Sequence, residues 1–166
     1  MIVVSDTSVI SNLLIIGELD LLRALYQEIL IPTAVHTELR ALENTDINYA
    51  AYQQANWIQV RDPENRAFAQ SLQATLDRGE SEAIALAHEL PGSYLAIDEK
   101  AGRHVAKSLG IKIVGLVGIL IQAKEGGLIA GVKPFLDQMI QDAGFYLSKR
   151  LYQQVLQDQG EWNPLE

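Results

Sequence analysis

Cysteine is absent from this 166-residue chain, and histidine is scarce, with His36, His88 and His104 making up the whole supply. The absence of cysteine excludes disulfides, thiolate metal sites and thiol catalysis, and it suits a reducing compartment. Any metal ion would have to be held by oxygen or histidine ligands. With so few histidines, we expect those ligands to be mostly carboxylates.

Long apolar segments are also lacking. The longest run, at 113–121, contains Gly115 and Gly118 and is far shorter than the roughly 20 residues that cross a membrane. The apolar start of the chain reaches Asp6 without a preceding basic segment, so the sequence predicts no signal peptide. We therefore expect a soluble, cytoplasmic protein with no membrane partner.

Positive charge is in short supply, because 13 Lys and Arg face 21 Asp and Glu and leave a net charge of −8. A general DNA-coating role is not expected, since non-specific binding to nucleic acids depends on basic side chains that neutralise phosphates. The same charge is compatible with a nuclease. A site that gathers carboxylates around divalent cations makes the bare protein acidic.

What the chain does contain is the pattern of an α/β domain, with 48% apolar and 20% charged residues. Short β-rich runs at 2–5, 29–31, 57–60, 94–97 and 112–114 alternate with helical patterns. This alternation is typical of a parallel sheet with helices on both faces. We predict a single domain over 1–166, with an α/β core at 1–122 and a helical extension at 123–166.

The extension is predicted to form a helical hairpin. Its first helix, at 134–143, would be stopped by Gly144, and Ser148 would cap a second helix at 149–157. The apolar residues of this hairpin are expected to pack on the domain or on a second subunit; they are Phe135, Met139, Ile140, Phe145, Leu151 and Val155.

Glu38 is the least expected residue of the sequence. It lies in a stretch that starts at Pro32 and places apolar residues at helical spacing, which predicts a helix. At roughly 100° per residue, Glu38 falls within the apolar arc that contains Val35 and Leu39. A carboxylate that points into a core is costly unless it is paired, protonated or bound to a metal ion.

Two further acids, Asp6 and Asp98, follow predicted strands. Ligands of open parallel sheets bind outside the carboxyl ends of the strands, which favours a functional role for both. A purely structural role is open as well, because Asp6 could cap the helix that starts near Ser8, and Asp98 precedes the helix at 100–109 with Glu99 as a competing first-turn acid.

A second acid on an apolar helical arc is Glu80, in the stretch 79–87. If this stretch is helical, Glu80 projects into the buried arc, whereas Glu82 lies with Glu89 toward its edge. The structural alternative is that Glu80 is a first-turn acid that favours the helix dipole.

Together, these positions predict a divalent metal site. Asp6, Glu38, Glu80 and Asp98 would repel one another without a counterion and shift one another's pKa values. Ligation by oxygen alone favours Mg²⁺ or Mn²⁺ over Zn²⁺. Mg²⁺ is commonly completed by substrate phosphate, so the pattern indicates phosphodiester chemistry.

The order and spacing of these stretches resemble the PIN-domain family of metal-dependent ribonucleases, and within it small prokaryotic proteins related to the toxins of type II toxin–antitoxin pairs. The matching pieces are V-V-S-D-T-S at 3–8, I-P-x-x-V-x-x-E-L at 31–39, G-E-S-E-A-I-A-L-A at 79–87 and L-A-I-D-E-x-x-G-R at 95–103. The pieces G-L-I at 127–129, K-P-F-L at 133–136 and A-G-F-Y-L-S at 143–148 also resemble this group. The resemblance therefore spans nearly the whole chain.

The resemblance implies a three-layer α/β/α fold with a central parallel sheet of four to five strands. It also implies Mg²⁺- or Mn²⁺-dependent hydrolysis of RNA, a homodimer and a cognate antitoxin partner. The family's four acids correspond to Asp6, Glu38, Glu80 and Asp98, with Glu82 as the rival of Glu80. Thr7, Ser8, Glu82 and Glu99 would lie around the metal ligands, and Glu99 stands where the group often has a second Asp.

Residues that would contact RNA are less well indicated. Arg103 and Lys107 lie about one turn apart on the predicted helix after Asp98 and could meet phosphates, although a solvent-facing pair is the simpler interpretation. His36 and His104 are expected to be solvated. The alternative to an enzyme is a binding module on the same scaffold, without catalytic activity, that acts through dimerisation or a protein partner.

Overall fold

A single sheet of five parallel strands forms the centre of the molecule in the computed structural model, which describes residues 1–166. The strands are β1 (Ile2–Ser5), β2 (Glu28–Ile31), β3 (Ile58–Val60), β4 (Tyr94–Ala96) and β5 (Lys112–Val114). Their order in the sheet is β3-β2-β1-β4-β5, and every neighbouring pair is parallel. The five strands predicted from the sequence are therefore confirmed, with ends that differ by at most one residue.

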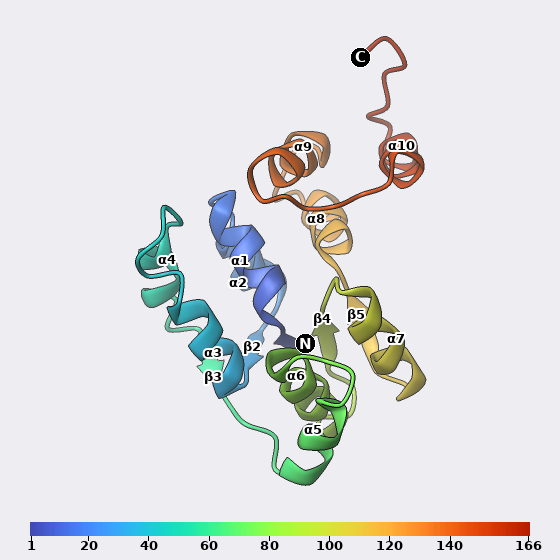
Figure 1. The fold of residues 1–166 in the computed structure, drawn as a ribbon. Coiled ribbons are helices and arrows are strands. Elements are labelled where there is room, and N and C mark those ends of the chain that lie inside the picture. The colour runs from blue at the N-terminus through green and yellow to red at the C-terminus, as the bar shows by residue number, and fades with distance from the viewer.

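Helices connect the strands and continue the chain after the last one (Figure 1). Those before β4 are α1 (Thr7–Ile15), α2 (Asp20–Leu25), α3 (Thr33–Arg40), α4 (Tyr49–Gln53), α5 (Arg66–Leu72) and α6 (Arg78–Glu89). The later ones are α7 (Lys100–Ser108), α8 (Leu116–Glu125), α9 (Lys133–Asp142) and α10 (Lys149–Asp158). None of the helices combines the length and the apolar character that a membrane span needs.

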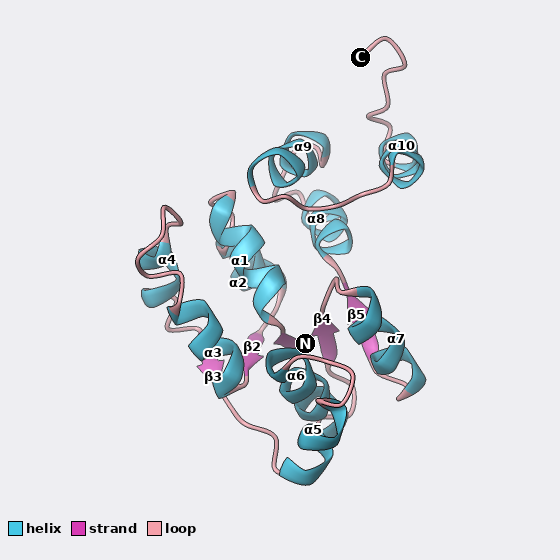
Figure 2. Ribbon diagram, in the orientation of Figure 1, coloured by secondary structure: helices cyan, strands magenta, loops and turns pink.

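Helices cover both faces of the sheet. Consecutive residues of a strand point to opposite faces, so neighbouring residues belong to different buried clusters. Val3 and Ile29 belong to a cluster of 28 buried residues that includes side chains of α1, α2, α8, α9 and α10. Val4 and Leu30 belong to a second cluster of 10, formed with α6 and α7. Figure 2 shows the strands enclosed between these helices. The fold is the predicted three-layer α/β/α arrangement.

The C-terminal helices form the predicted hairpin. Gly144 follows α9 with φ +65°, a left-handed conformation that glycine adopts without strain, and Ser148 caps α10 by accepting a hydrogen bond from the Leu151 amide at 3.1 Å. Met139 and Val155 are buried in the larger cluster, so the hairpin packs on the domain. The predicted core boundary at residue 122 falls inside α8, because this helix continues from the sheet to residue 125.

The carboxyl ends of β1 and β4 lie side by side at the place where the strand order reverses. From β1 the chain proceeds outward through β2 and β3, and it then returns to β4 on the opposite side of β1. Ser5 is paired with Ala96 in the register of these two strands. In doubly wound sheets this reversal leaves a crevice outside the strand ends, where ligands bind.

Candidate active site

Asp6 is the residue that immediately follows β1, and it is almost fully buried, with 2% of its surface exposed. Its carboxylate caps α1 by accepting hydrogen bonds from the Val9 amide at 3.2 Å and from the Ser8 hydroxyl at 3.2 Å. The capping role considered from the sequence is therefore real. It does not exclude a functional role, because a carboxylate oxygen accepts more than one partner.

Burial raises the pKa of Asp6 to about 8. The hydrogen bonds from Val9 and Ser8 oppose this rise, whereas the negative charges of Asp98 and Glu80 add to it. Asp6 is thus a buried acid whose anionic form is disfavoured in the metal-free protein, and a nearby cation would reverse that preference.

Asp98 lies after β4 and is linked to the start of α8 and to α7. Its carboxylate accepts a hydrogen bond from the Leu116 amide at 3.1 Å, and Arg103 Nη1 lies 3.6 Å from Oδ1. Burial raises the pKa of Asp98, and the Leu116 amide and the Arg103 guanidinium lower it in part. The simpler interpretation of Arg103 as a solvent-facing residue is wrong, because Arg103 pairs with Asp98 and also donates to the Ile97 carbonyl at 3.4 Å.

Glu38 lies on α3 and is half-buried. The predicted helix runs from Thr33 to Arg40 with Pro32 as its N-cap residue, and Glu43 lies in the turn that follows. The Thr7 hydroxyl, at the start of α1, donates a hydrogen bond to Glu38 Oε2. A hydrogen bond therefore links Glu38 to Thr7, the residue that follows Asp6.

Glu80 lies in the first turn of α6, where Asp77 caps the helix by accepting a hydrogen bond from the Glu80 amide at 2.8 Å. The side chain nevertheless points inward, and only 8% of the residue is exposed. Burial, together with the charge of Asp77, raises the pKa of Glu80 to about 7. The charges of Glu99 and Glu38 contribute to this rise, and the Asp77 backbone amide opposes it.

The sequence placed Glu82 toward the edge of the buried arc of α6. This prediction is wrong, because Glu82 is only 4% exposed. Every residue of α6 from Gly79 to Ala87 is buried, because α5 covers the side of α6 that faces away from the sheet. Glu82 Oε1 lies 3.2 Å from Arg78 and 4.0 Å from Arg66, and Oε2 is buried without a hydrogen-bond partner. Residues two positions apart on a helix differ by roughly 200°, so Glu80 and Glu82 face different neighbours.

Two glycines make room for two of the acids. A β-carbon on Gly79 would lie 2.6 Å from Glu38 Oε1, and one on Gly115 would lie 2.5 Å from Asp98 Oδ1. Gly102 makes room for Ile97 instead, because a β-carbon there would lie 2.5 Å from Ile97 Cδ1 but at an ordinary contact distance of 3.5 Å from Glu80 Oε1. The sequence interpretation did not identify these residues. For Gly79 and Gly102 the available signal was glycine inside a helical pattern, which is costly unless close packing requires it.

The convergence of the four acids is incomplete in the structure. No three acidic or histidine side chains lie close enough together to hold one metal ion between them. Each acid is oriented by a local contact of its own, such as Thr7 for Glu38 and Leu116 for Asp98. The predicted cluster is therefore a group of neighbouring carboxylates rather than a formed coordination sphere.

These residues still fit a divalent cation by two criteria. All the donors are carboxylate oxygens, which are the ligands that Mg²⁺ and Mn²⁺ prefer. Burial of Asp6 and Glu80 raises the pKa of both carboxyl groups, so a cation would offset an existing electrostatic cost. The donor chemistry and the charge distribution thus agree with the site that the sequence predicts.

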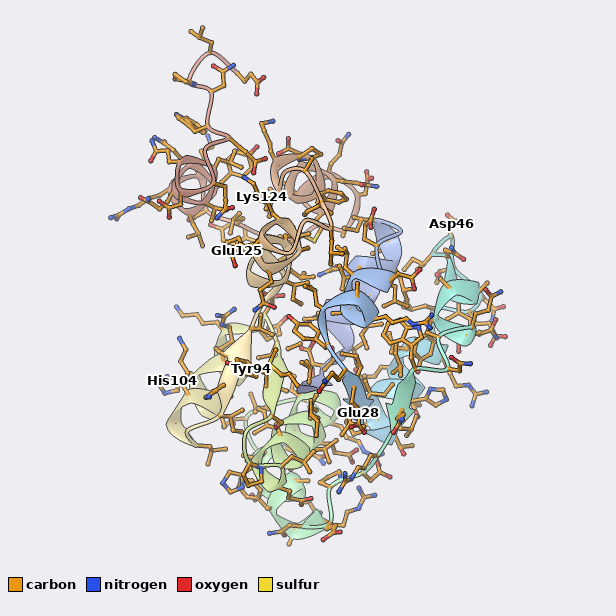
Figure 3. All side chains as sticks on the ribbon, turned by 180° about the vertical axis from the view of Figure 1, so that it is seen from behind. Glu28, Asp46, Tyr94, His104, Lys124 and Glu125 are labelled. Atoms are coloured by element: carbon orange, nitrogen blue, oxygen red, sulfur yellow. The ribbon has the colours of Figure 1, made fainter.

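The other predicted residues are distributed around this centre. Thr7 and Ser8 contact Glu38 and Asp6, as described above, whereas Glu99 and Lys107 are exposed. His104 is exposed on the outer side of α7, as expected (Figure 3). His36 is not simply solvated, because its Nδ1 lies 2.6 Å from the buried Tyr52 hydroxyl.

Comparison with known proteins agrees with this architecture. A family model described as a PIN domain matches residues 2–161. A solved structure, a PilT N-terminus domain protein from the archaeon Sulfolobus solfataricus P2, superimposes with a TM-score of 0.52 at 22% identity, over 74% of this chain and 93% of that one. No curated protein matches the chain. Since the family model covers almost every residue from β1 to the end of α10, the chain belongs to the PIN-domain family.

Proposed function

We propose that the protein is a metal-dependent ribonuclease that hydrolyses phosphodiester bonds of RNA. PIN domains are generally nucleases and typically use divalent metals, which supports the nuclease class. The observation that carries the proposal is the placement of Asp6 and Asp98 at adjacent strand ends, with Glu80 and Glu38 on the helices beside them. This is the position in an open parallel sheet where ligands bind.

In this proposal, Asp6, Glu38, Glu80 and Asp98 hold Mg²⁺ or Mn²⁺. When bound, the cation supplies a water nucleophile of lowered pKa and stabilises charge on the leaving oxygen. The chain's own groups orient the ligands, since Thr7 donates to Glu38 and Ser8 donates to Asp6. Arg103 orients Asp98 and brings a positive charge to a strongly acidic region, where a phosphate would otherwise be repelled.

The alternative is a PIN-like binding module without catalytic activity. The observation that favours it is the separation of the acids, because no three of them are placed to share a metal ion. In such a protein the acids would act as caps and ion-pair partners, and the domain would act through dimerisation or a protein partner.

The experiment that separates these functions is cleavage of single-stranded RNA by the wild type with Mn²⁺ or Mg²⁺ and with EDTA. We expect cleavage only with metal, and we expect the Glu38→Gln variant to be inactive. Glu43→Gln is a matched control, because Glu43 is exposed in the turn just after α3. Cleavage in EDTA would contradict the mechanism, and folded protein without cleavage under any metal condition would favour the binding module.

We further propose that the ribonuclease is the toxin of a type II toxin–antitoxin pair, which works as a homodimer and is held inactive by an antitoxin. The support is the set of sequence stretches that resemble this group of PIN domains. Induced expression in bacteria should then stop growth, and Glu38→Gln should relieve the arrest. Light scattering should give twice the 18.3 kDa chain mass; unaffected growth or a monomer would contradict the corresponding part.

A further inference from the structure

A groove of about 560 Å³ opens directly beside the candidate site, and none of the roles assigned above uses it. Its lining includes Asp98, Arg103, Gly115, Gln122, Phe145 and Tyr146, and the other lining residues are apolar side chains and one glycine of β5, α8, α10 and the segment before α10. Its walls therefore come from both the sheet edge and the C-terminal extension. In Figure 1 the segment between α9 and α10 passes across α8, which is the helix that carries Gln122.

The position of Tyr146 is the first observation about this groove. The residue is 84% exposed, although its backbone is fixed on both sides. Before it, the Phe145 amide donates to the Met139 carbonyl at 3.1 Å; after it, Ser148 caps α10. A large aromatic ring held at the surface by a fixed backbone loses little conformational entropy when a planar ligand stacks on it.

Gln122 supplies the second observation. The Tyr26 hydroxyl donates to Gln122 Oε1 at 2.6 Å, and this hydrogen bond fixes the orientation of the Gln122 amide. The Gln122 Nε2 group has no hydrogen-bond partner within the protein, and Gln122 is among the residues that line the groove. An oriented donor beside an exposed aromatic ring suits a flat ligand with acceptor atoms along its edge.

Charge and continuity limit the class of ligand. Arg103, which pairs with Asp98 at 3.6 Å, places a guanidinium where the groove meets the candidate site. The groove thus contains a guanidinium paired with a carboxylate, and an exposed aromatic ring with a polar donor. A nucleotide has the matching parts, a phosphate joined to a planar base with hydrogen-bond acceptors.

We propose that this groove binds an unpaired nucleobase next to the cleaved phosphodiester, stacked on Tyr146 and hydrogen-bonded through an acceptor atom to Gln122. The proposal rests on the ribonuclease function above and requires single-stranded RNA, since a base that stacks on a side chain and bonds through its free edge is unpaired. Tyr146 and Gln122 are therefore binding residues that select the substrate, and they take no part in the hydrolysis.

The direct test is the affinity of the full chain for a fluorescein-labelled 12-nucleotide single-stranded RNA, measured by fluorescence anisotropy. Ca²⁺ replaces Mg²⁺ or Mn²⁺, because Ca²⁺ binds oxygen ligands without their strict octahedral geometry. Tyr146→Ala should weaken binding about fivefold to a hundredfold, the range expected for the loss of one base–aromatic stack. Tyr146→Phe keeps the ring and should stay within about twofold of the wild type.

Gln122→Met tests the hydrogen bond and should also weaken binding. Tyr26→Phe is its matched control, because it removes the same internal hydrogen bond but leaves the Gln122 amide in place. The Tyr26→Phe variant should bind RNA more tightly than Gln122→Met, because it loses the orientation of the amide but keeps the donor. Equal loss of binding in both variants would show that only the packing of α8 matters and would overturn the role of Gln122.

Photo-crosslinking of an RNA that carries 5-iodouridine separates this proposal from the proposed function. A crosslink mapped to Tyr146 in a protein that cleaves no RNA would support base binding in the groove and contradict the ribonuclease function. Metal-dependent cleavage, with no crosslink at Tyr146 and no effect of Tyr146→Ala on RNA affinity, would contradict base binding in the groove and support the ribonuclease function. A change in molar mass on Tyr146→Ala would identify the surface as a contact between two copies and would overturn the proposal.

Discussion

Gly79 on α6 lies against the carboxylate of Glu38 on α3, so closely that a β-carbon at position 79 would approach both Glu38 oxygens, at 2.6 and 2.7 Å. Gly79 has no left-handed backbone conformation that would explain the residue type. The close approach of the carboxylate does explain it. The glycine lets α3 and α6 bring Glu38 next to the helix turn that carries Glu80.

Gly79→Ala should separate folding from function. The atoms that a new methyl group would meet are the far end of a flexible side chain, so the fold can adapt by displacing Glu38. Because alanine favours helices, by up to about 1 kcal/mol over glycine, the free energy of unfolding should be unchanged or slightly higher. The affinity for the metal ion, measured through thermal unfolding, and the rate of RNA cleavage should both fall at least tenfold. Thermal unfolding and RNA cleavage, measured side by side, check this prediction.

Gly118→Ala is the control for that experiment. Its β-carbon would meet a valine methyl group at 3.2 Å and no carboxylate. It should leave metal-dependent stabilisation unchanged. A Gly79→Ala protein that binds metal as well as the wild type would show that the position of Glu38 is irrelevant to the site.

Glu80 and Glu82 can be distinguished by a pair of isosteric substitutions. Glu80→Gln should remove most of the stabilisation by Mn²⁺, because the charge of Glu80 acts on Asp6 and the charge of Glu38 acts on Glu80. Glu82→Gln should retain it, because Glu82 contacts Arg78 and Arg66 instead. The readout is the Mn²⁺-dependent change in melting temperature, and the reverse result would make Glu82 the ligand.

The stability of the metal-free protein should depend on pH through Asp6. Its pKa of about 8 in the folded state is well above the value near 3.9 of an unfolded aspartate, so the folded state retains a proton that the unfolded state loses. The proton on Asp6 therefore stabilises the folded state. Its contribution to the free energy of unfolding is complete below pH about 4 and is lost as the pH rises toward 8. In EDTA, Asp6→Asn should flatten the fall in melting temperature between pH 5 and 8. A wild type whose melting temperature does not fall more steeply than that of Asp6→Asn would contradict the burial argument.

Arg103 should control the ionisation of Asp98. The guanidinium lies 3.6 Å from the carboxylate and lowers its pKa, so Arg103→Ala should raise the pKa of Asp98. Lys107→Ala, one turn further along α7 and exposed, should not. Carboxyl NMR titration of the metal-free protein measures both, and identical titration curves for the two variants would remove Arg103 from the site.

Much of the fold could be predicted because the relevant signals are local. The alternation of short apolar runs with helical patterns identified all five strands, and Gly144 and Ser148 marked the helical hairpin correctly. Such signals depend on backbone conformation and capping within a few residues. The resemblance to PIN domains supplied the order of layers.

What could not be predicted depends on contacts between distant elements. The burial of Glu82 follows from the packing of α5 on α6, and the orientation of Asp98 depends on the Leu116 amide at the start of α8. The roles of Gly79 and Gly115 require the positions of side chains on other elements. A single helix pattern assumes one solvent face, and α6 has none over most of its length.

The measurement that tests the central claim most directly is thermal unfolding of the wild type and of Glu38→Gln during titration with Mn²⁺. A cation bound only by the folded state at about 100 times its Kd stabilises by about 2.7 kcal/mol, which corresponds to about 5–10 °C for a chain of this size. We predict a shift of this order for the wild type and almost none for Glu38→Gln. No shift in the wild type, or an equal shift in both proteins, would contradict the account.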